Sequence, residues 1–234
     1  MLYKKILLKL SGEAFSGEKG YGIDRQMLVF FASEIKSILS KDVKVAVVIG
    51  GGNFWRGRTA LDFDRVTADS IGMMATVMNA LAFKDVILAE GMPARVFSAV
   101  EIPKFTENLV ISKAKQSFNE GCVTIFAGGT GSPFFSTDSA AALRSLDIGA
   151  QAILKATLVD GVYDRDPHEF NDAEKYDSIT YMELLSKGLK VLDSTAASLC
   201  MDNKMPIHVF NLKPGNLLKL LNGEPLGTII KEAK

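Results

Sequence analysis

Short, continuously apolar runs alternate along the chain with longer stretches in which apolar residues recur at helical spacing. The runs are four to seven residues long, and many contain β-branched residues, which is typical of strands covered on both faces. The longer stretches predict amphipathic helices. The predicted strands are Lys4–Leu10, Lys44–Ile49, Ala94–Ala99, Cys122–Phe126, Gln151–Ala156, Ile207–Phe210 and Gly227–Ile230, the last as an edge strand.

Helix starts are marked by capping residues. Asp24 is placed to cap a helix that continues to Leu39. Thr180-x-x-Glu183 is a capping-box pattern, and Gly188 is placed to end the helix that it opens. The other predicted helices are Arg65 to Leu88, Lys113–Asn119, Asp138 to Leu146, Asp193–Lys204 and Leu217–Leu221; residues 159–178 form an acidic, irregular segment, and Gly17–Gly22 a flexible loop.

Alternating strands and helices predict an α/β fold, a three-layer αβα sandwich with a mostly parallel central sheet. We expect a single domain over residues 1–234, with halves of approximately 1–150 and 151–234 sharing one sheet. Ligands of such sheets bind beyond the carboxyl ends of the strands. Four predicted strands end there in residues suited to a ligand: Ser11-Gly12, Gly50–Gly52, Gly128–Gly131 and Lys155-Ala-Thr157.

Composition points to a globular protein, because 47% of the residues are apolar and 23% are charged. Lys+Arg and Asp+Glu both count 27, so no overall field favours nucleic acid or an anionic membrane. The N-terminus lacks the pattern of a signal peptide, and the apolar stretch Ile71–Phe83 is expected to fall short of a membrane span. Cys122 and Cys200 are expected to be reduced, and the protein cytoplasmic.

Common catalytic signatures are missing from the sequence. It contains neither a P-loop Gly-x-x-x-x-Gly-Lys-Ser/Thr nor a Gly-x-Gly-x-x-Gly after a strand. It also lacks Gly-x-Ser-x-Gly, His-Glu-x-x-His and any Cys/His cluster, and His168 and His208 have no evident partner. Histidine catalysis and a dedicated protein metal site are therefore not expected.

The stretch Ala127–Asp138 joins a predicted strand to a predicted helix. It holds three glycines within four residues, then Pro133 and two aromatic residues, and it ends in Ser136-Thr137-Asp138. Glycines permit close backbone approach, and hydroxyl and N–H groups at a helix start suit an anion such as phosphate. A tight turn with a capping residue accounts for the stretch equally well.

Two basic groups lie at the ends of predicted strands. Lys9 either extends to solvent or is a cation held over a transferring phosphate, whose charge it offsets. Arg56 follows a triple glycine and is placed to fork onto phosphate oxygens, with Arg58 as the alternative. Cations aimed at developing charge are what phosphoryl transfer needs, so these residues favour a kinase over a hydrolase.

Several acids have both a structural and a functional interpretation. Asp69 either interacts with a helix dipole or accepts hydrogen bonds from ribose hydroxyls. Asp138 is either a helix cap or a carboxylate that orients Lys9 or a metal-bound water. Asp193 is interpreted as a cap. Asp160, Asp164 and Asp166 form a weak candidate metal site, since solvated acids are commoner in such loops.

Taken together, the motifs resemble those of the bacterial UMP kinases, which have the amino-acid kinase fold. The resemblance runs from about Lys5 to Ile230. It rests on four segments in the family's order: Lys9-Leu-Ser-Gly12-Glu-Ala, Val48-Ile-Gly-Gly-Gly-Asn53 with Arg56-Gly57, Thr130-Gly-Ser-Pro-Phe-Phe-Ser-Thr-Asp138, and Lys155-Ala-Thr157-x-Val-Asp160-Gly-Val-Tyr163-x-x-Asp166-Pro167.

This resemblance implies transfer of the γ-phosphoryl group of ATP to UMP, giving UDP and ADP in pyrimidine nucleotide synthesis, with Mg²⁺ bound mainly through the ATP phosphates. Lys9, Arg56 and Asp138 would be catalytic. The half over residues 1–150 would bind UMP, and the half over residues 151–234 the ATP nucleoside. By motif position, the ATP residues would be Lys9, Leu10, Ser11, Gly12, Gly52, Arg56, Thr157, Tyr163 and Asp166, and the UMP residues Gly51, Asp69, Thr130, Gly131, Ser132, Pro133, Phe134, Phe135, Ser136 and Thr137.

The family also implies regulation and assembly. GTP would be an activator, UTP an inhibitor, and the enzyme a homohexamer. The matching allosteric GTP loop is Gly17, Glu18, Lys19, Gly20, Tyr21 and Gly22. The sequence departs from the usual pattern at Ser132, where many members have Asn, at Ser136, where Thr is common, and at Trp55 in the glycine-rich loop. None of these departures removes a charge.

Three alternatives remain at this stage. A carbamate or amino-acid kinase of the same fold would need a site for a carboxylate substrate, whereas Pro133-Phe134-Phe135 suits a base and ribose-phosphate better. A catalytically silent nucleotide sensor would be expected to have lost Lys9, Arg56 or Asp138, and the sequence keeps all three. A dinucleotide-binding domain would carry the fingerprint that is missing here.

Overall fold

The computed structural model describes residues 1–55 and 62–232. Its centre is a nine-stranded sheet in the order β4-β3-β5-β2-β1-β6-β10-β11-β9, which places strands from both halves of the chain side by side. The strands are β1 Lys5–Leu10, β2 Lys44–Ile49, β3 Ala94–Ser98, β4 Glu107–Asn108, β5 Val123–Ala127, β6 Ala152–Thr157, β9 Ser178–Thr180, β10 Ile207–Asn211 and β11 Thr228–Lys231; β7 Val162–Tyr163 and β8 Lys175–Tyr176 form a separate hairpin.

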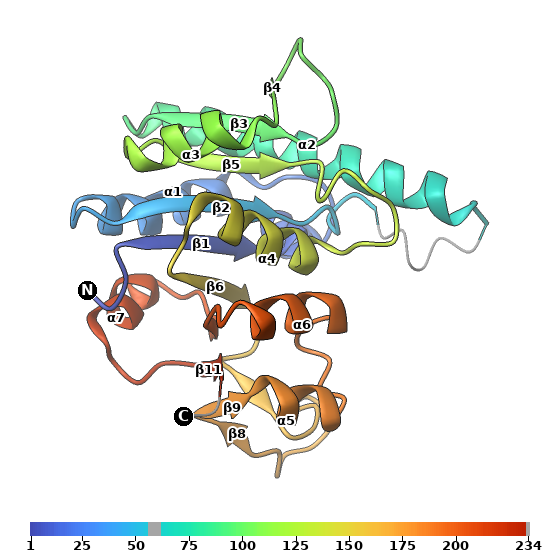
Figure 1. Cartoon of the computed structure of the whole chain (residues 1–234), viewed down its shortest axis with the longest axis vertical. Coiled ribbons are helices and arrows are strands. Elements are labelled where there is room, and N and C mark those ends of the chain that lie inside the picture. Colours follow the sequence, from blue (N-terminus) through green and yellow to red (C-terminus); the bar gives the residue numbers. More distant parts are fainter. Residues whose placement is uncertain (56–61, 233–234) are drawn as a thin grey trace.

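Helices cover both faces of the sheet, as the predicted three-layer α/β fold requires (Figure 1). α1, α2 and α7 contribute side chains to one hydrophobic core, and α3, α4, α5 and α6 to the other. Alternation along β1 feeds both cores, since Leu8 and Leu10 enter the first and Leu7 the second. The helices are α1 Arg25–Leu39, α2 Arg65–Ala89, α3 Ile111–Asn119, α4 Thr137–Ile148, α5 Tyr181–Ser186, α6 Ser194–Asp202 and α7 Asn216–Asn222.

The strand order corrects one prediction. β11 was expected at an edge, but it pairs antiparallel with β10 on one side and parallel with β9 on the other. β9 begins at Ser178, the last residue of the segment that we expected to be irregular, and ends at Thr180, the cap of α5. Its three residues pair only with a strand far along the chain, so local pattern does not reveal it. The hairpin β7–β8 in the same segment was also missed.

Capping confirms some helix starts and shifts one. Asp24, Thr180 and Asp193 cap α1, α5 and α6, as predicted. In α4 the cap is Ser136, whose Oγ accepts from the backbone N–H groups of Asp138 and Ser139. The cap interpretation of Asp138 was therefore wrong, and its carboxylate is left for other contacts.

Helix α2 matches the helix predicted from Arg65 to Leu88 and contains the apolar stretch Ile71–Phe83. The whole helix, with 25 residues, is long and apolar enough to cross a membrane by length and composition alone, which was not expected from that stretch. It is the one such helix among residues 1–55 and 62–232. In the structure it packs against β3 and β5, and Phe83 and Ile87 are fully buried there. These contacts are those of a core helix.

Candidate active site

Two lysines and one carboxylate form a compact cluster at the carboxyl ends of β1 and β6. The strands are parallel and pair Lys9 directly with Lys155, so both side chains leave the same face of the sheet. Asp138, in the first turn of α4, lies between them. Its Oδ1 is 2.8 Å from the Lys9 ammonium, and its Oδ2 accepts a hydrogen bond of 2.5 Å from Lys155.

Burial makes these charges interdependent. Although burial alone raises the pKa of the Asp138 carboxyl, the positive charges of Lys9 and Lys155 outweigh it and lower that pKa to about 2. Burial lowers the pKa of Lys155, and Asp138 partly offsets the shift. With all three groups ionised, the cluster carries one net positive charge, which favours an anion beside it.

Hydrogen bonds also connect the cluster to the start of α6. Lys155 also donates to the carbonyl oxygen of Val191, just before that helix. Asp193 accepts from the backbone N–H of Ala196 as a cap, and it accepts from the hydroxyls of Ser136 and Ser139 at the start of α4. The starts of α4 and α6 are therefore joined through one carboxylate.

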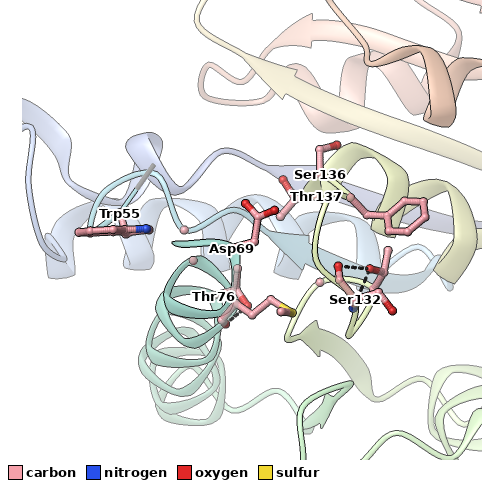
Figure 2. A pocket seen from close by; sticks show the side chains of 12 residues that line it. Trp55, Asp69, Thr76, Ser132, Ser136 and Thr137 are labelled. Carbon is pink, nitrogen blue, oxygen red and sulfur yellow. Dashed lines mark hydrogen bonds between the residues drawn. The ribbon is translucent and has the colours of Figure 1, made fainter. Parts of the chain in front are cut away.

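A cavity of about 140 Å³ opens beside the start of α4 (Figure 2). Its lining comes from α2, from the loop after β5 and from the glycine-rich loop after β2. The described residues that line it include one acid, Asp69, and no lysine or arginine. The lining residues are Gly51, Trp55, Asp69, Gly72, Met73, Thr76, Gly129, Thr130, Ser132, Phe135, Ser136 and Thr137.

Helix α2 fixes the wall of this cavity with polar side chains. Asp69 accepts from the backbone N–H of Phe134 and pairs with Arg65, both at 2.8 Å. Two turns further along α2, the Thr76 hydroxyl accepts a hydrogen bond from the backbone N–H of Gly128, also at 2.8 Å. Asp69 does not cap α2, because Asp64 does so. The acid is instead the group that ties the loop after β5 to the helix.

Seven of the ten predicted UMP residues line this cavity, and the other three lie in the loop after β5. Gly51, Asp69, Thr130, Ser132, Phe135, Ser136 and Thr137 line it, whereas Gly131, Pro133 and Phe134 do not. Phe134 is 64% exposed, and its backbone has a φ of 72°, in the left-handed region that few phenylalanines adopt. The hydrogen bond from its N–H to Asp69 holds that conformation.

The predicted ATP nucleoside residues meet at a second cavity of about 680 Å³. Thr157, Tyr163 and Asp166 all line it, together with Lys155 and residues 187–191. The cluster borders both cavities, because Lys155 lines the second and Asp138 directly follows Thr137, which lines the first. Asp160 accepts from the Tyr163 hydroxyl at 2.6 Å and from Lys175 at 3.0 Å. Within residues 1–55 and 62–232, His, Cys, Asp and Glu form no group of three that could hold a metal ion.

The predicted phosphate residues lie around the same strand ends. A Cβ on Gly12 would lie 2.5 Å from the Gly50 carbonyl oxygen and 2.6 Å from the Gly52 nitrogen, so only glycine allows this approach. Leu10 and Ser11 line a third, mostly apolar cavity of about 310 Å³, on the face of the sheet that α1 covers. Arg56 and its alternative Arg58 lie outside the described residues.

The predicted allosteric loop touches this region. Gly17 and Glu18 line the third cavity, and Gly17–Lys19 form a single 3-10 turn. Lys19 and Gly20 are exposed. At the end of the loop, Gly22 donates its N–H to the carbonyl oxygen of Asn53, and the Tyr21 ring meets Phe54 edge-on at 5.7 Å.

The sequence placed Lys155 at a strand end suited to a ligand but did not identify it as a partner of Lys9 and Asp138. The sequence shows a lysine near the end of a buried, apolar strand, which is itself a signal because burying an ammonium is costly without a partner. Its relation to Lys9 depends on the register between β1 and β6, however. Without that register, the two lysines belong to unrelated motifs.

Comparison with known proteins agrees with this architecture. A model of the amino acid kinase family matches residues 4–211. The solved structure of UMP kinase from Bacillus anthracis superposes with a TM-score of 0.96 at 34% identity, covering 100% of this chain and 98% of that one. UMP kinase from Ureaplasma parvum gives 0.92 at 36% identity (99% and 100%), and uridylate kinase from Archaeoglobus fulgidus 0.74 at 29% identity (96% and 99%).

Proposed function

The chain belongs to the amino acid kinase family and is a phosphotransferase, and from this premise we propose that it transfers the γ-phosphoryl group of ATP to UMP, giving UDP and ADP. The observation that carries the proposal is the Lys9–Asp138–Lys155 cluster, in which Lys155 lines one cavity and Asp138 directly follows Thr137 in the lining of the other. A phosphoryl group passing between ligands in those cavities would travel past two ammonium groups. Such groups offset the charge that develops on the transferring oxygens.

The cavity beside α4 is the proposed UMP site. Asp69 is the acid in its wall and would accept hydrogen bonds from ribose hydroxyls, while Phe135 and Trp55 offer ring surface. A nucleotide brings the ribose hydroxyls and the base that Asp69 and these rings suit, whereas a small acid substrate has neither. The wall therefore favours a nucleoside monophosphate over the substrate of an acid kinase of the same fold, and the phosphate of UMP would lie toward the net positive lysine cluster.

The cavity beyond Lys155 is the proposed site of the ATP nucleoside, with Thr157, Tyr163 and Asp166 in its wall. The half over residues 1–150 would then hold UMP, and the half over residues 151–234 the ATP nucleoside. Ser11, Gly12 and Gly52 would face the ATP phosphates, with Arg56 beside them. Asp138 would hold the Lys9 ammonium in place beside them.

Mg²⁺ would be bound mainly through the ATP phosphates. The donor set fits this arrangement, because both oxygens of Asp138 are engaged by lysines and the described residues supply no acidic cluster for a dedicated site. When bound, the ion would neutralise phosphate charge and hold the phosphates in one geometry. Asp138 would therefore orient Lys9 rather than a metal-bound water.

We also propose activation by GTP through Gly17–Gly22, inhibition by UTP, a homohexamer and a cytoplasmic location, as in the family that the motifs resemble. The support from this chain is local. The loop ends in a backbone hydrogen bond to Asn53, within the glycine-rich loop that lines the proposed UMP site.

The test is ADP release from Mg·ATP with UMP, CMP, carbamate, aspartate and acetylglutamate offered separately. Turnover with UMP and not with the three acids is the expected result. Turnover with an acid would move the chain to another substrate class of the same family. Release with none of them, from protein that still binds nucleotide, would favour a nucleotide sensor.

A further inference from the structure

Two buried asparagines face each other beneath the glycine-rich loops. Asn53 follows the glycine run after β2, and Asn79 lies in the middle of α2; they are 1% and 0% exposed. Each side-chain amide donates to the other's oxygen, Asn53 to Asn79 at 2.9 Å and Asn79 to Asn53 at 2.7 Å. The two amides therefore form a reciprocal pair out of contact with water.

The second N–H of each amide reaches a backbone carbonyl. Asn53 donates to the Gly22 carbonyl oxygen at 2.7 Å, and Asn79 donates to that of Gly50 at 2.8 Å. All four side-chain N–H groups are thus used, which fixes how both amides are oriented. Turning either amide over would set oxygen against oxygen in a buried site, where an unmet hydrogen bond is most costly.

Three segments that are distant in sequence meet at this pair. Gly22 both receives the Asn53 amide and donates its own N–H to the Asn53 carbonyl at 3.0 Å. Gly50 receives the Asn79 amide. Gly12 packs directly on the pair, because a Cβ built there would lie 2.7 Å from the Asn53 side-chain oxygen. No other residue type could make that approach without moving the amide.

We propose that Asn53 and Asn79 act together as positioning residues, holding the segments at Gly12, Gly22 and Gly50 in one mutual geometry. Movement of Gly22 or Gly50 then requires breaking a hydrogen bond of the buried amide pair, and movement of Gly12 changes its close packing against the Asn53 side chain. Displacement of Gly22 is transmitted to the Gly50–Gly52 backbone through Asn53, which contacts Gly22 with both its amide and its carbonyl, and through Asn79, which binds Gly50. The kinetic consequences rest on the proposed function, which places the Gly12 and Gly50–Gly52 segments beside the phosphates, whereas the structural coupling does not.

Hydrogen exchange tests the coupling without any substrate. Asn79→Leu keeps the branched shape and the number of side-chain heavy atoms, and it removes every hydrogen bond that this amide makes. We expect amides in peptides covering residues 11–14, 20–24 and 49–55 to exchange about tenfold faster or more, all three together. Faster exchange confined to α2, with the three segments unchanged, would overturn the inference. Asn79→Ser introduces a side chain smaller than asparagine and avoids crowding, and it is expected to affect the same peptides if the leucine variant does not fold.

Comparing kcat with the unfolding midpoint then distinguishes a positioning role of the pair from a purely stabilising one. A displacement of roughly 1 Å at a reacting group costs about a hundredfold in rate, so kcat of Asn79→Leu with ATP and UMP is expected to fall by about that factor. The matched control is Thr124→Val, which removes a buried hydrogen bond of 3.3 Å to Ser117, on the other face of the sheet. It is expected to lower the unfolding midpoint while kcat stays within about twofold.

Two outcomes distinguish the claims. If Asn79→Leu lowers the unfolding midpoint as Thr124→Val does and keeps its kcat at a temperature where both are folded, the pair is structural only. If the wild type does not phosphorylate UMP, the proposed function fails, and the exchange pattern still decides whether the three segments are coupled. The Asn53→Leu/Asn79→Leu double variant should lose no more activity than the worse single variant, because both act through one unit.

Discussion

Lys9 and Lys155 are register partners on adjacent parallel strands, and their ammonium groups contact opposite oxygens of one carboxylate, that of Asp138. Two like charges on the same face of neighbouring strands would repel each other. The carboxylate removes most of that cost while leaving one positive charge in excess. A phosphate between the two cavities would supply the remaining negative charge, so the cluster is suited to bind an anion that arrives and leaves.

Replacement of Lys9 by methionine tests whether its charge acts in the transition state. Lys9→Met should lower kcat by about a hundredfold or more, while the KM for UMP changes far less, because the ammonium matters most when charge develops on the transferring group. Initial rates over a grid of ATP and UMP concentrations give both constants. An equal loss in UMP binding and in turnover would mean that Lys9 merely holds substrate.

Asp138→Asn should both inactivate and destabilise the protein. It leaves two ammonium groups close together in a largely buried site, a change that costs about 3 kcal/mol of unfolding free energy in comparable pairs. Urea denaturation at pH 7 measures the loss.

The double variant Asp138→Asn/Lys155→Met should recover part of that stability, because it removes the more buried ammonium. As a control, Glu90→Gln breaks the exposed pair with Lys36, at 3.5 Å, and should change stability by less than about 0.5 kcal/mol. If the double variant is less stable than Asp138→Asn alone, repulsion between the lysines is not the cause.

Asp69→Asn should act mainly on UMP. The Asp69 carboxylate accepts from the Phe134 N–H and pairs with Arg65, and the neutral amide of the variant weakens both interactions. The loop after β5 is then held less firmly to α2. We expect the KM for UMP to rise by about tenfold, equal to ~1.4 kcal/mol, with a smaller change for ATP. Asp85→Asn, at an exposed position of the same helix, is the control. An unchanged UMP dependence would remove Asp69 from the site.

Stability should fall on mild acidification because of His208. Burial, with a smaller contribution from the positive charge of Lys231, lowers the pKa of His208 from 6.5 to about 4. The folded state therefore binds this proton less readily than the unfolded chain, so stability is full above pH 6.5 and is lost as the pH falls toward 4. The expected loss is about 3 kcal/mol.

Urea denaturation between pH 7 and pH 4 tests this dependence. His208→Gln should flatten the slope, whereas His168→Gln, at an exposed loop position, should leave it unchanged. Asp138 adds its own loss only below about pH 4, because the lysines hold its carboxyl pKa at about 2. A wild-type slope that survives in His208→Gln would assign the titration to another group.

The central strands were predictable because each is a continuous apolar run that needs cover on both faces. Asp24, Thr180 and Asp193 were recognised as caps because capping depends on a few neighbouring residues. β9 was not predictable, since three residues form it and a strand about fifty positions later stabilises it. The same pairing moved β11 away from the edge.

Within the site, the sequence identified the loops that line the cavities better than it identified the contacts between side chains of different segments. Its glycine runs and Asp69 do lie at one cavity, and Thr157, Tyr163 and Asp166 at another. The partnership of Lys155 with Asp138 required the register of β1 with β6, and the Asn53–Asn79 pair required α2 to lie beneath the loop after β2. Such contacts are set by tertiary packing, which neither periodicity nor motif spacing encodes.

The most direct measurement is ³¹P NMR of a mixture of Mg·ATP, UMP and the protein, run beside the same mixture with Lys9→Met. Resonances of UDP should grow in step with those of ADP as UMP disappears, and in the variant they should grow about a hundredfold more slowly. ADP that forms with inorganic phosphate and without UDP, or UDP that forms equally fast in the variant, would contradict transfer to UMP assisted by the lysine cluster.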